Sequence, residues 1–205
     1  MFTGIITDVG CIEDIQPLKQ GMRLKISTRY AIESLTIGAS IACSGICLTI
    51  VERGLKQDDS NWFVVEAWEE TLRLTNLAQW TKGTFVNLER SLRLGDEMGG
   101  HLVSGHIDGL AEIIDQKNEG DAIRFYLKVA RQFMPFIVNK GSIALNGTSL
   151  TVNGVEDCVF DVLIIRHTLE MTTWGQAGIG DRVNLEIDQL ARYAVKIFAL
   201  KREDE

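Results

Sequence analysis

The sequence predicts an all-β protein built from two tandem copies of one small domain, with a helix at the C-terminus. The main observation is a repeat: residues 39–50 read ASIACSGICLTI, and residues 141–152 read GSIALNGTSLTV. A second pair, GTFVNLE at 83–89 and GDRVNLE at 180–186, follows at nearly the same spacing. The motif recurs 102 positions later. Solenoid units span only roughly 20–50 residues, so a spacing of this size indicates a duplicated domain. The predicted boundaries are about 1–97 and 98–189 for the copies and 190–205 for the tail.

Alternation of apolar and polar residues predicts the strands. The segment MRLKIS at 22–27 alternates strictly, which is typical of a strand with one buried face. Turn signals between about six short strands per copy indicate a small barrel or sandwich. Strands are predicted at 1–15, 22–27, 40–51 (a strand pair), 61–67, 84–89, 122–129, 140–155 (a strand pair), 159–165 and 182–187. Short helices or helical turns are predicted at 31–35, 69–78, 132–138 and 168–172.

The tail from Asp188 to Lys201 is predicted to form an amphipathic helix. Its apolar residues recur at helical spacing on one face: Leu190, Tyr193, Ala194, Ile197 and Phe198. Such a face needs a surface to cover. Two alternatives stay open, because the helix can pack on its own domain or associate with the same helix of other subunits.

Composition excludes several classes of protein. The 205 residues carry a net charge of −7, with 45% hydrophobic and 24% charged residues, as in ordinary globular proteins. The acidic balance argues against nucleic-acid binding, which needs a basic face. No apolar run approaches the roughly 20 residues of a membrane span, and the N-terminus does not resemble a signal peptide. We therefore expect a cytoplasmic protein that binds neither nucleic acid nor membrane.

The four cysteines, Cys11, Cys43, Cys47 and Cys158, lack Cys-x-x-Cys spacing. Free thiols in a reducing compartment are therefore expected. Cys43 and Cys47 could in principle join His101 and His106 around zinc, but the spacing matches no usual finger or ribbon, so no metal site is expected.

Small nucleophile-capable side chains recur at equivalent positions of the two copies. They are Ser40, Cys47 and Thr49 in the first copy and Ser142, Ser149 and Thr151 in the second. Hydroxyls and thiols along one strand pair can line a pocket and bind a polar ligand, so two similar pockets are expected. Gly45, Leu48, Gly147 and Leu150 also recur, and turn or core roles explain them better.

The two copies differ at a histidine. The second copy has Gly105-His106-Ile107 where the first has Gly4-Ile5-Ile6. An imidazole with a pKa near 6.5 suits proton transfer, although a solvated or core-satisfied histidine is an equal alternative. His101 is interpreted as structural. Cys47 could act as a nucleophile only with a depressed pKa, which the sequence does not indicate.

Several motifs at matching spacing together resemble the riboflavin synthases of the alpha-chain type, over essentially the whole chain. They are MFTGII at 1–6, CLT at 47–49, ETLRLTN at 70–76, GGHLVSGHI at 99–107, NGTSLTV at 146–152 and TLEMTT at 168–173. The resemblance implies two six-stranded Greek-key barrels and a homotrimer assembled through the C-terminal helices. It also implies an active site between the first barrel of one subunit and the second barrel of its neighbour.

The implied reaction needs no cofactor and no metal. Two molecules of 6,7-dimethyl-8-(1-D-ribityl)lumazine exchange a four-carbon unit and give riboflavin and 5-amino-6-(D-ribitylamino)uracil. Two homologous pockets suit a reaction between two copies of one substrate, because holding both rings in register can lower the barrier by up to roughly 7–11 kcal/mol. Association with lumazine synthase is a further implied partnership.

The resemblance also assigns substrate contacts residue by residue. In the first barrel they are Gly4, Ile5, Ile6, Ser40, Cys47, Leu48, Thr49, Glu66, Ala67, Trp68, Glu69, Glu70 and Thr71. Phe2 matches an N-terminal aromatic residue that helps shape the catalytic site. In the second barrel they are Gly105, His106, Ile107, Lys140, Ser149, Leu150, Thr151, Ile165, Arg166, His167, Thr168, Leu169 and Glu170. Glu186 and Asp188 match carboxylates near the site, and Asp188 can instead cap the tail helix.

The catalytic roles stay open at this point. Asn146 stands where many relatives have Asp, so it can only hydrogen-bond and cannot act as a carboxylate base. We hypothesise that Ser40, Cys47 or a bound water adds to C7 of one lumazine, while His106 and Thr151 assist proton transfer from the other. The alternative is a non-catalytic relative that binds lumazine or flavin as a fluorophore.

Overall fold

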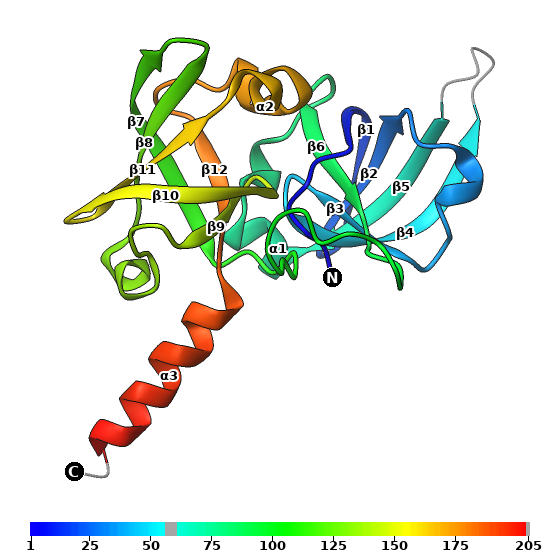
Figure 1. The fold of residues 1–205 in the computed structure, drawn as a ribbon. Coiled ribbons are helices and arrows are strands. Elements are labelled where there is room, and N and C mark those ends of the chain that lie inside the picture. Colours follow the sequence, from blue (N-terminus) through cyan, green and yellow to red (C-terminus); the bar gives the residue numbers. More distant parts are fainter. Residues whose placement is uncertain (56–60, 204–205) are drawn as a thin grey trace.

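The chain folds into two closed six-stranded barrels that lie side by side, and one long helix projects from the second barrel (Figure 1). The structure is a computed structural model of the chain and describes residues 1–55 and 61–203. The strand pairings within both barrels are antiparallel. The expected fold class, two tandem all-β barrels with a C-terminal helix, is confirmed.

The first barrel has the strand order β1-β2-β5-β4-β3-β6, and pairing of β6 with β1 closes it. The step from β2 to β5 gives the barrel its Greek-key connection. Its strands are β1 (Asp8–Leu18), β2 (Gly21–Thr28), β3 (Ser40–Cys43), β4 (Ile46–Leu55), β5 (Asn61–Trp68) and β6 (Phe85–Arg90). Its helical segments are η1 (Ile32–Ser34), α1 (Glu69–Leu74) and η2 (Asn76–Gln79).

The second barrel repeats this order as β7-β8-β11-β10-β9-β12. Its strands are β7 (Gly109–Glu119), β8 (Ala122–Lys128), β9 (Ser142–Leu145), β10 (Thr148–Glu156), β11 (Val159–Ile164) and β12 (Arg182–Ile187). Its helical segments are η3 (Arg131–Phe136), α2 (Arg166–Met171) and η4 (Thr173–Gln176), and α3 (Gln189–Glu203) follows β12.

Each barrel has its own apolar core, built from the inward residues of the alternating strands. In β2, for example, Leu24 and Ile26 are fully buried while their neighbours are only half-buried. The second core contains a tilted aromatic pair, Phe125 and Trp174, with ring centroids 5.1 Å apart. Because one face of each strand is buried, a slip of one residue would expose the whole core face, and this fixes the register.

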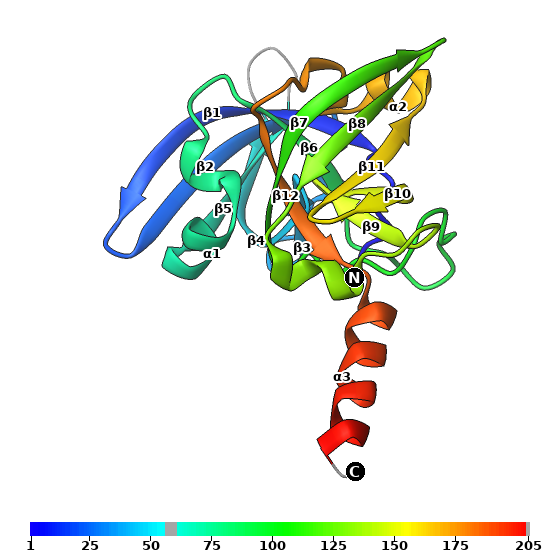
Figure 2. The same cartoon turned by 90° about the vertical axis from the view of Figure 1, so that its left-hand side faces the viewer.

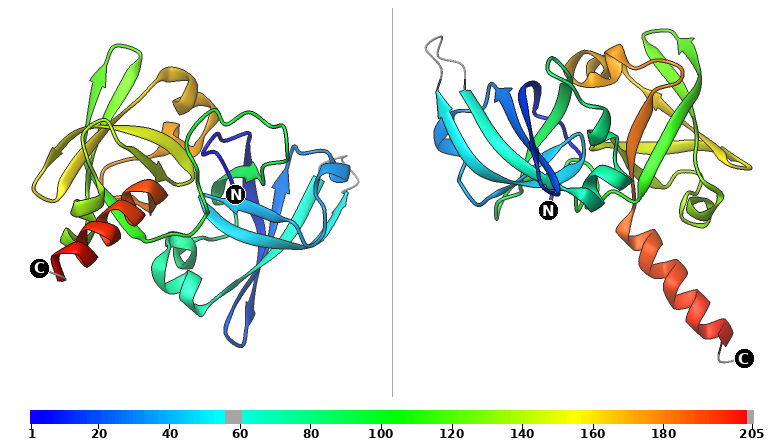
Figure 3. Two further views of the ribbon diagram at one scale, coloured as in Figure 1. Left: turned by 60° about the horizontal axis from the view of Figure 1, so that its bottom comes forward. Right: turned by 180° about the vertical axis from the view of Figure 1, so that it is seen from behind.

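Residues 1–7 correct one prediction, because they do not belong to the predicted strand over 1–15. They form only an isolated bridge between Phe2 and Val103, and β1 begins at Asp8. Gly4 has a φ of +76°, in the left-handed region that interrupts an extended run. The N-terminus therefore lies at the junction of the two barrels instead of along the first (Figures 1 and 3).

The short helices lie where they were predicted, but their bounds differ by a few residues. The helix expected over 69–78 is divided, since α1 ends at Leu74 and the extended residue Thr75 begins a separate 3-10 turn. Thr75 accepts a hydrogen bond from the N–H of Leu77, an ordinary capping role for threonine. The second copy does the same at Thr172, and its helix begins at Arg166, before the predicted residue 168.

Two fully buried asparagines make equivalent contacts across the junction and hold the barrels together. The Asn87 side chain donates to the carbonyl of Asn146 (2.9 Å) and accepts from the N–H of Thr173 (2.8 Å). The Asn184 side chain donates to the carbonyl of Ser44 (2.9 Å) and accepts from the N–H of Asn76 (2.8 Å). Each amide thus satisfies two backbone groups of the other barrel, which fixes how the barrels lie.

Helix α3 is capped by Asp188 and leaves the second barrel. The Asp188 carboxylate accepts a hydrogen bond from the N–H of Leu190 (2.8 Å). Asp188 therefore caps α3, which is one of the two roles that the sequence left open. Arg192 ties the first turns to the barrel through Asp108 (2.7 Å). Beyond these turns α3 points away from both barrels (Figures 1 and 2).

Candidate functional site

The recurring hydroxyl and thiol side chains lie on the outer faces of the two barrels. In the first barrel β3 pairs with β4 so that Ser40 is opposite Thr49 and Ala42 is opposite Cys47. In the second barrel Ser142 is opposite Thr151 and Ala144 is opposite Ser149. Residues between them, such as Ile41 and Leu48, point into the core. Each barrel therefore presents one polar outer face, and we call these the first and second faces.

A glycine turn from the other copy lies against each face. The carbonyl of Gly105 accepts a hydrogen bond from the N–H of Cys47 (2.9 Å), and that of Gly4 accepts from the N–H of Ser149 (2.8 Å). An added Cβ at either glycine would lie 2.6 Å from the Cβ of Cys47 or Ser149. Only glycine permits this approach, which explains why it recurs at both positions.

This crossing corrects the expected grouping of the site residues. Gly105, His106 and Ile107 were expected at the pocket of the second barrel. They lie instead on the first barrel, where Gly105 binds Cys47 and Ile107 packs against the core. Gly4 conversely lies on the second barrel. The exposed His106 side chain and Thr151 are therefore on different barrels of one chain.

Two buried carboxylates hold the glycine turns in place. Glu186 accepts hydrogen bonds from the N–H groups of Ser104 (2.6 Å), Gly105 (2.8 Å) and His106 (3.1 Å). Glu89 does the same for Thr3 (2.6 Å) and Gly4 (2.9 Å). Burial raises the pKa of Glu186 to about 7, despite backbone hydrogen bonds that favour the carboxylate, and it also raises that of Glu89. Both glutamates therefore position the backbone of the glycine turns. The sequence analysis did not identify Glu89, although the VNLE motif at 86–89 repeats the one that contains Glu186.

Phe2 separates the two faces within one chain. It is fully buried in a small cluster with Ala42, Val103 and Ala144, against which Cys47 packs. Its backbone exchanges hydrogen bonds with Val103 at 2.7 and 3.0 Å. Since Ala42 and Ala144 belong to the two strand pairs that carry the faces, the Phe2–Val103 bridge fills the space between them.

His101 is placed beside Ser149 at the second face. Its Nδ1 atom and the Ser149 hydroxyl share a hydrogen bond of 2.7 Å. Burial lowers the pKa of His101, and nearby Asp188 partly opposes this effect. Burial therefore favours the neutral form of an imidazole that lies beside a predicted substrate contact. Sequence reasoning interpreted this histidine as structural, because only the fold brings residues 101 and 149 together.

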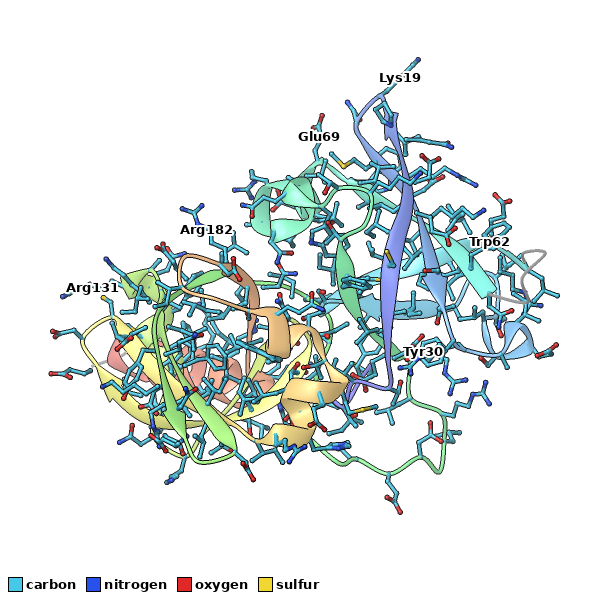
Figure 4. All side chains as sticks on the ribbon, turned by 90° about the horizontal axis from the view of Figure 1, so that it is seen from above. Lys19, Tyr30, Trp62, Glu69, Arg131 and Arg182 are labelled. Atoms are coloured by element: carbon cyan, nitrogen blue, oxygen red, sulfur yellow. The ribbon has the colours of Figure 1, made fainter. Side chains whose placement is uncertain are left out.

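The predicted contacts at residues 66–71 and 165–170 lie at or after the C-terminal ends of β5 and β11 and in the helices α1 and α2 that follow them. Glu66 projects from the outside of β5 and binds Arg23 (2.7 Å). At the start of α1 the exposed Glu69 points away from the barrel (Figure 4). The remaining predicted contacts here are Ala67, Trp68, Glu70 and Thr71 and, around α2, Ile165, Arg166, His167, Thr168, Leu169 and Glu170.

A cavity between the barrels lies away from the two faces. It has a volume of about 570 Å³ between the barrels and is lined by residues such as Trp80, Trp174 and Arg182. Only Asn146 lines it among the residues that the resemblance places in the catalytic centre, which are Ser40, Cys47, His106, Thr151, Phe2, Asn146, Glu186 and Asp188. The Asn146 side chain accepts from the N–H of Asn184 (2.8 Å), so its amide supports the junction. The cavity therefore lies at the junction of the barrels, and the recurring hydroxyl and thiol side chains of the two faces do not line it.

The arrangement suits binding of flat polar molecules against two similar faces. Each offers a hydroxyl-rich strand pair, a glycine turn and a nearby polar segment, and the first adds the Cys47 thiol. Lys140 lies beside the second face with a φ of +65°, and its Nζ is 3.5 Å from Asn153. Within residues 1–55 and 61–203 there is no group of three or more His, Cys, Asp or Glu placed to hold a metal. Among these residues no helix is long and apolar enough to span a membrane.

Solved structures of another protein share this fold. LumP complexed with riboflavin matches with a TM-score of 0.79 at 24% identity, covering 91% of this chain and 99% of that chain. LumP complexed with 6,7-dimethyl-8-(1'-D-ribityl)lumazine matches with a TM-score of 0.76, also at 24% identity and with the same coverage.

Sequence comparison defines the family. The lumazine binding domain matches twice, at residues 3–91 and 104–188. The riboflavin synthase of Brucella abortus is 60% identical over 96% of this chain and 98% of its own length. Those of Schizosaccharomyces pombe (39% identity, 96% of this chain and 93% of the relative) and Bacillus subtilis (36%, 100% and 93%) also match. Full-length similarity that includes both copies means that the chain belongs to the riboflavin synthase family of enzymes.

Proposed function

We propose that the protein converts two molecules of 6,7-dimethyl-8-(1-D-ribityl)lumazine into riboflavin and 5-amino-6-(D-ribitylamino)uracil. The observation that carries the proposal is the duplicated face, with Ser40, Cys47 and Thr49 in one barrel matched by Ser142, Ser149 and Thr151 in the other. A reaction between two identical substrates needs two similar binding surfaces. The four-carbon unit moves from one lumazine to the other, so no external oxidant or reductant is required.

The roles of the residues follow from the chemistry of the two faces. Ser40, Cys47 or a bound water adds to C7 of the acceptor on the first face, and His106 lies on the same barrel. Thr151 on the second face takes part in proton transfer from the donor. His106 and Thr151 belong to different barrels, so both can serve one reaction only when a first face meets a second face.

We infer that the two faces come from different subunits. The Phe2–Val103 bridge fills the space between the faces of one chain. Helix α3 meanwhile leaves Leu190, Tyr193, Ile197 and Phe198 exposed, with 78, 64, 55 and 68% of their surface accessible. A free apolar helix face of this size favours association. The proposed assembly is a homotrimer in the cytoplasm that joins through α3, and association with lumazine synthase stays a prediction.

The direct test is incubation of the purified protein with 6,7-dimethyl-8-(1-D-ribityl)lumazine alone, followed by absorbance. One riboflavin should form for every two lumazine molecules consumed, without added cofactor. Tight binding without turnover would replace the proposal with a fluorophore-binding function. Ligand binding should then saturate without any 5-amino-6-(D-ribitylamino)uracil being formed.

A further inference from the structure

Arg23 connects the polar residues beside the first face. From β2 its guanidinium donates to Glu66 on β5 (2.7 Å) and to Glu52 on β4 (2.6 Å). Arg23 and Glu66 each keep 30% of their side-chain surface accessible. Charge-assisted hydrogen bonds of this length are among the stronger ones, and they fix a carboxylate that would otherwise rotate freely.

Strand register places Glu66 in one row with the residues of the first face. Arg23 is opposite Glu66 across β2 and β5, and Ser40 is opposite Thr49 across β3 and β4. Ile50 is opposite Val65, so Thr49 and Glu66, the next residues along these strands, are neighbours with outward side chains. The row runs from the hydroxyls of the face to the Arg23 guanidinium.

The second barrel supplies an internal comparison. Arg124 occupies the position of Arg23 and is opposite Leu163, which occupies the position of Glu66. Arg124 binds Glu119 (2.6 Å) and Asp161 instead. Both barrels therefore have an arginine bound to two carboxylates. Only in the first barrel does one of these carboxylates, that of Glu66, belong to the row of outward residues that includes the face.

We propose that Arg23 is a positioning residue, which holds Glu66 so that its free carboxylate oxygen accepts a hydrogen bond from a hydroxyl of the ribityl chain. The proposal rests on the proposed function, because the ribityl chain belongs to its substrate. Glu66 binds Arg23 through Oε1, and Oε2 makes no hydrogen bond to the described residues. The first barrel thus recognises the polyol with a group that the second barrel lacks.

The test compares Arg23→Gln, Arg23→Lys, Glu66→Gln and the double variant Arg23→Gln/Glu66→Gln with the matched control Arg124→Gln. Arg23→Gln should raise the KM and the Kd for riboflavin about fivefold to tenfold, with kcat changed less than twofold. The double variant should bind riboflavin no more weakly than Glu66→Gln does, because both substitutions remove the same interaction with the ribityl chain. Arg23→Lys should bind riboflavin more tightly than Arg23→Gln does. In Arg124→Gln the KM and the Kd for riboflavin should stay within twofold of the parent values.

Binding of 6,7,8-trimethyllumazine, which lacks the ribityl chain, separates this proposal from a general loss of structure. Its Kd should be the same in Arg23→Gln and the parent. Unchanged riboflavin binding in Arg23→Gln, or equal losses for both ligands, would overturn the role of Arg23. If the parent formed no riboflavin, that result would count against the proposed function alone. The Kd values for riboflavin and for 6,7,8-trimethyllumazine would still test the role of Arg23 in binding.

Discussion

Glu186 shows how one residue determines the shape of a face. It replaces three backbone-to-water hydrogen bonds with three to its own carboxylate, and so fixes the turn that brings Gly105 to Cys47. The cost is a buried charge, which is why its pKa rises to about 7. Glu89 has the equivalent role for Gly4, although its carboxylate also accepts from the Thr3 hydroxyl.

Glu186 should make stability depend on pH near neutrality. Its pKa is raised in the folded state, so its stabilising contribution is complete below the unfolded pKa of about 4.3 and is lost as pH rises through about 7. The loss is on the order of 3 kcal/mol. Between pH 5 and 8 the free energy of unfolding should therefore fall more steeply in the parent than in Glu186→Gln, as measured by urea denaturation. Parallel curves for the two proteins would contradict this prediction.

The thiol and hydroxyl of the first face give a second prediction for single residues. Ser40→Ala and Cys47→Ser remove or alter the two candidate nucleophiles on neighbouring strands. If a side chain adds to C7, one of these variants should lose at least about tenfold in kcat, equal to about 1.4 kcal/mol of barrier. Steady-state riboflavin formation measures this effect. Parental rates in both variants would leave bound water as the nucleophile.

At the scale of elements, the sequence predicted what local patterning controls. Alternation placed the strands because one face of each barrel strand is buried, and the repeat placed the strand pairs at 40–51 and 140–155. The crossing of the glycine turns could not be predicted. It depends on contacts such as Gly4 with Ser149, which no local pattern encodes. The same limit explains why His101 was interpreted as structural.

The turns at Gly45 and Gly147 test how closely the barrels pack. Gly147 has a φ of +78°, and an added Cβ would lie 2.7 Å from the nitrogen of Gly45. Gly147→Ala should therefore combine backbone strain of about 1–2 kcal/mol with a clash against backbone. Gly180→Ala is the control, because φ is +93° there but no atom lies within 4 Å of the added Cβ. Urea denaturation should show a clearly larger loss for Gly147→Ala, and equal losses would mean that the junction can relax.

At the scale of the whole molecule, duplication explains both the likeness and the difference of the two faces. Asn87 and Asn184 make equivalent contacts to the opposite barrel, and both barrels carry the same outward strand pair. The Phe2–Val103 bridge lies between those strand pairs. The sequence therefore identified which residues could form the faces, but their grouping depends on how the barrels are arranged and how chains assemble.

Helix α3 should control assembly and, through it, activity. Ile197→Asp together with Phe198→Lys places charges on its exposed apolar side without touching either barrel, because both side chains are solvent-accessible. The variant should sediment as a monomer, keep its barrels folded and lose riboflavin formation. A monomer with full activity would show that one chain contains a complete site.

Mixed assemblies extend this prediction to the active site itself. A chain with an impaired first face (Ser40→Ala/Cys47→Ala) and one with an impaired second face (Ser149→Ala/Thr151→Ala) should each be nearly inactive alone. When both are produced together, an intact first face of one chain can meet an intact second face of the other, and activity should return. The same mixture with Ile197→Asp/Phe198→Lys in both chains is the control and should stay inactive, because α3 would no longer bring the faces together. Activity no higher than the sum of the separate chains would place both substrates on a single chain, despite the Phe2–Val103 bridge between its faces.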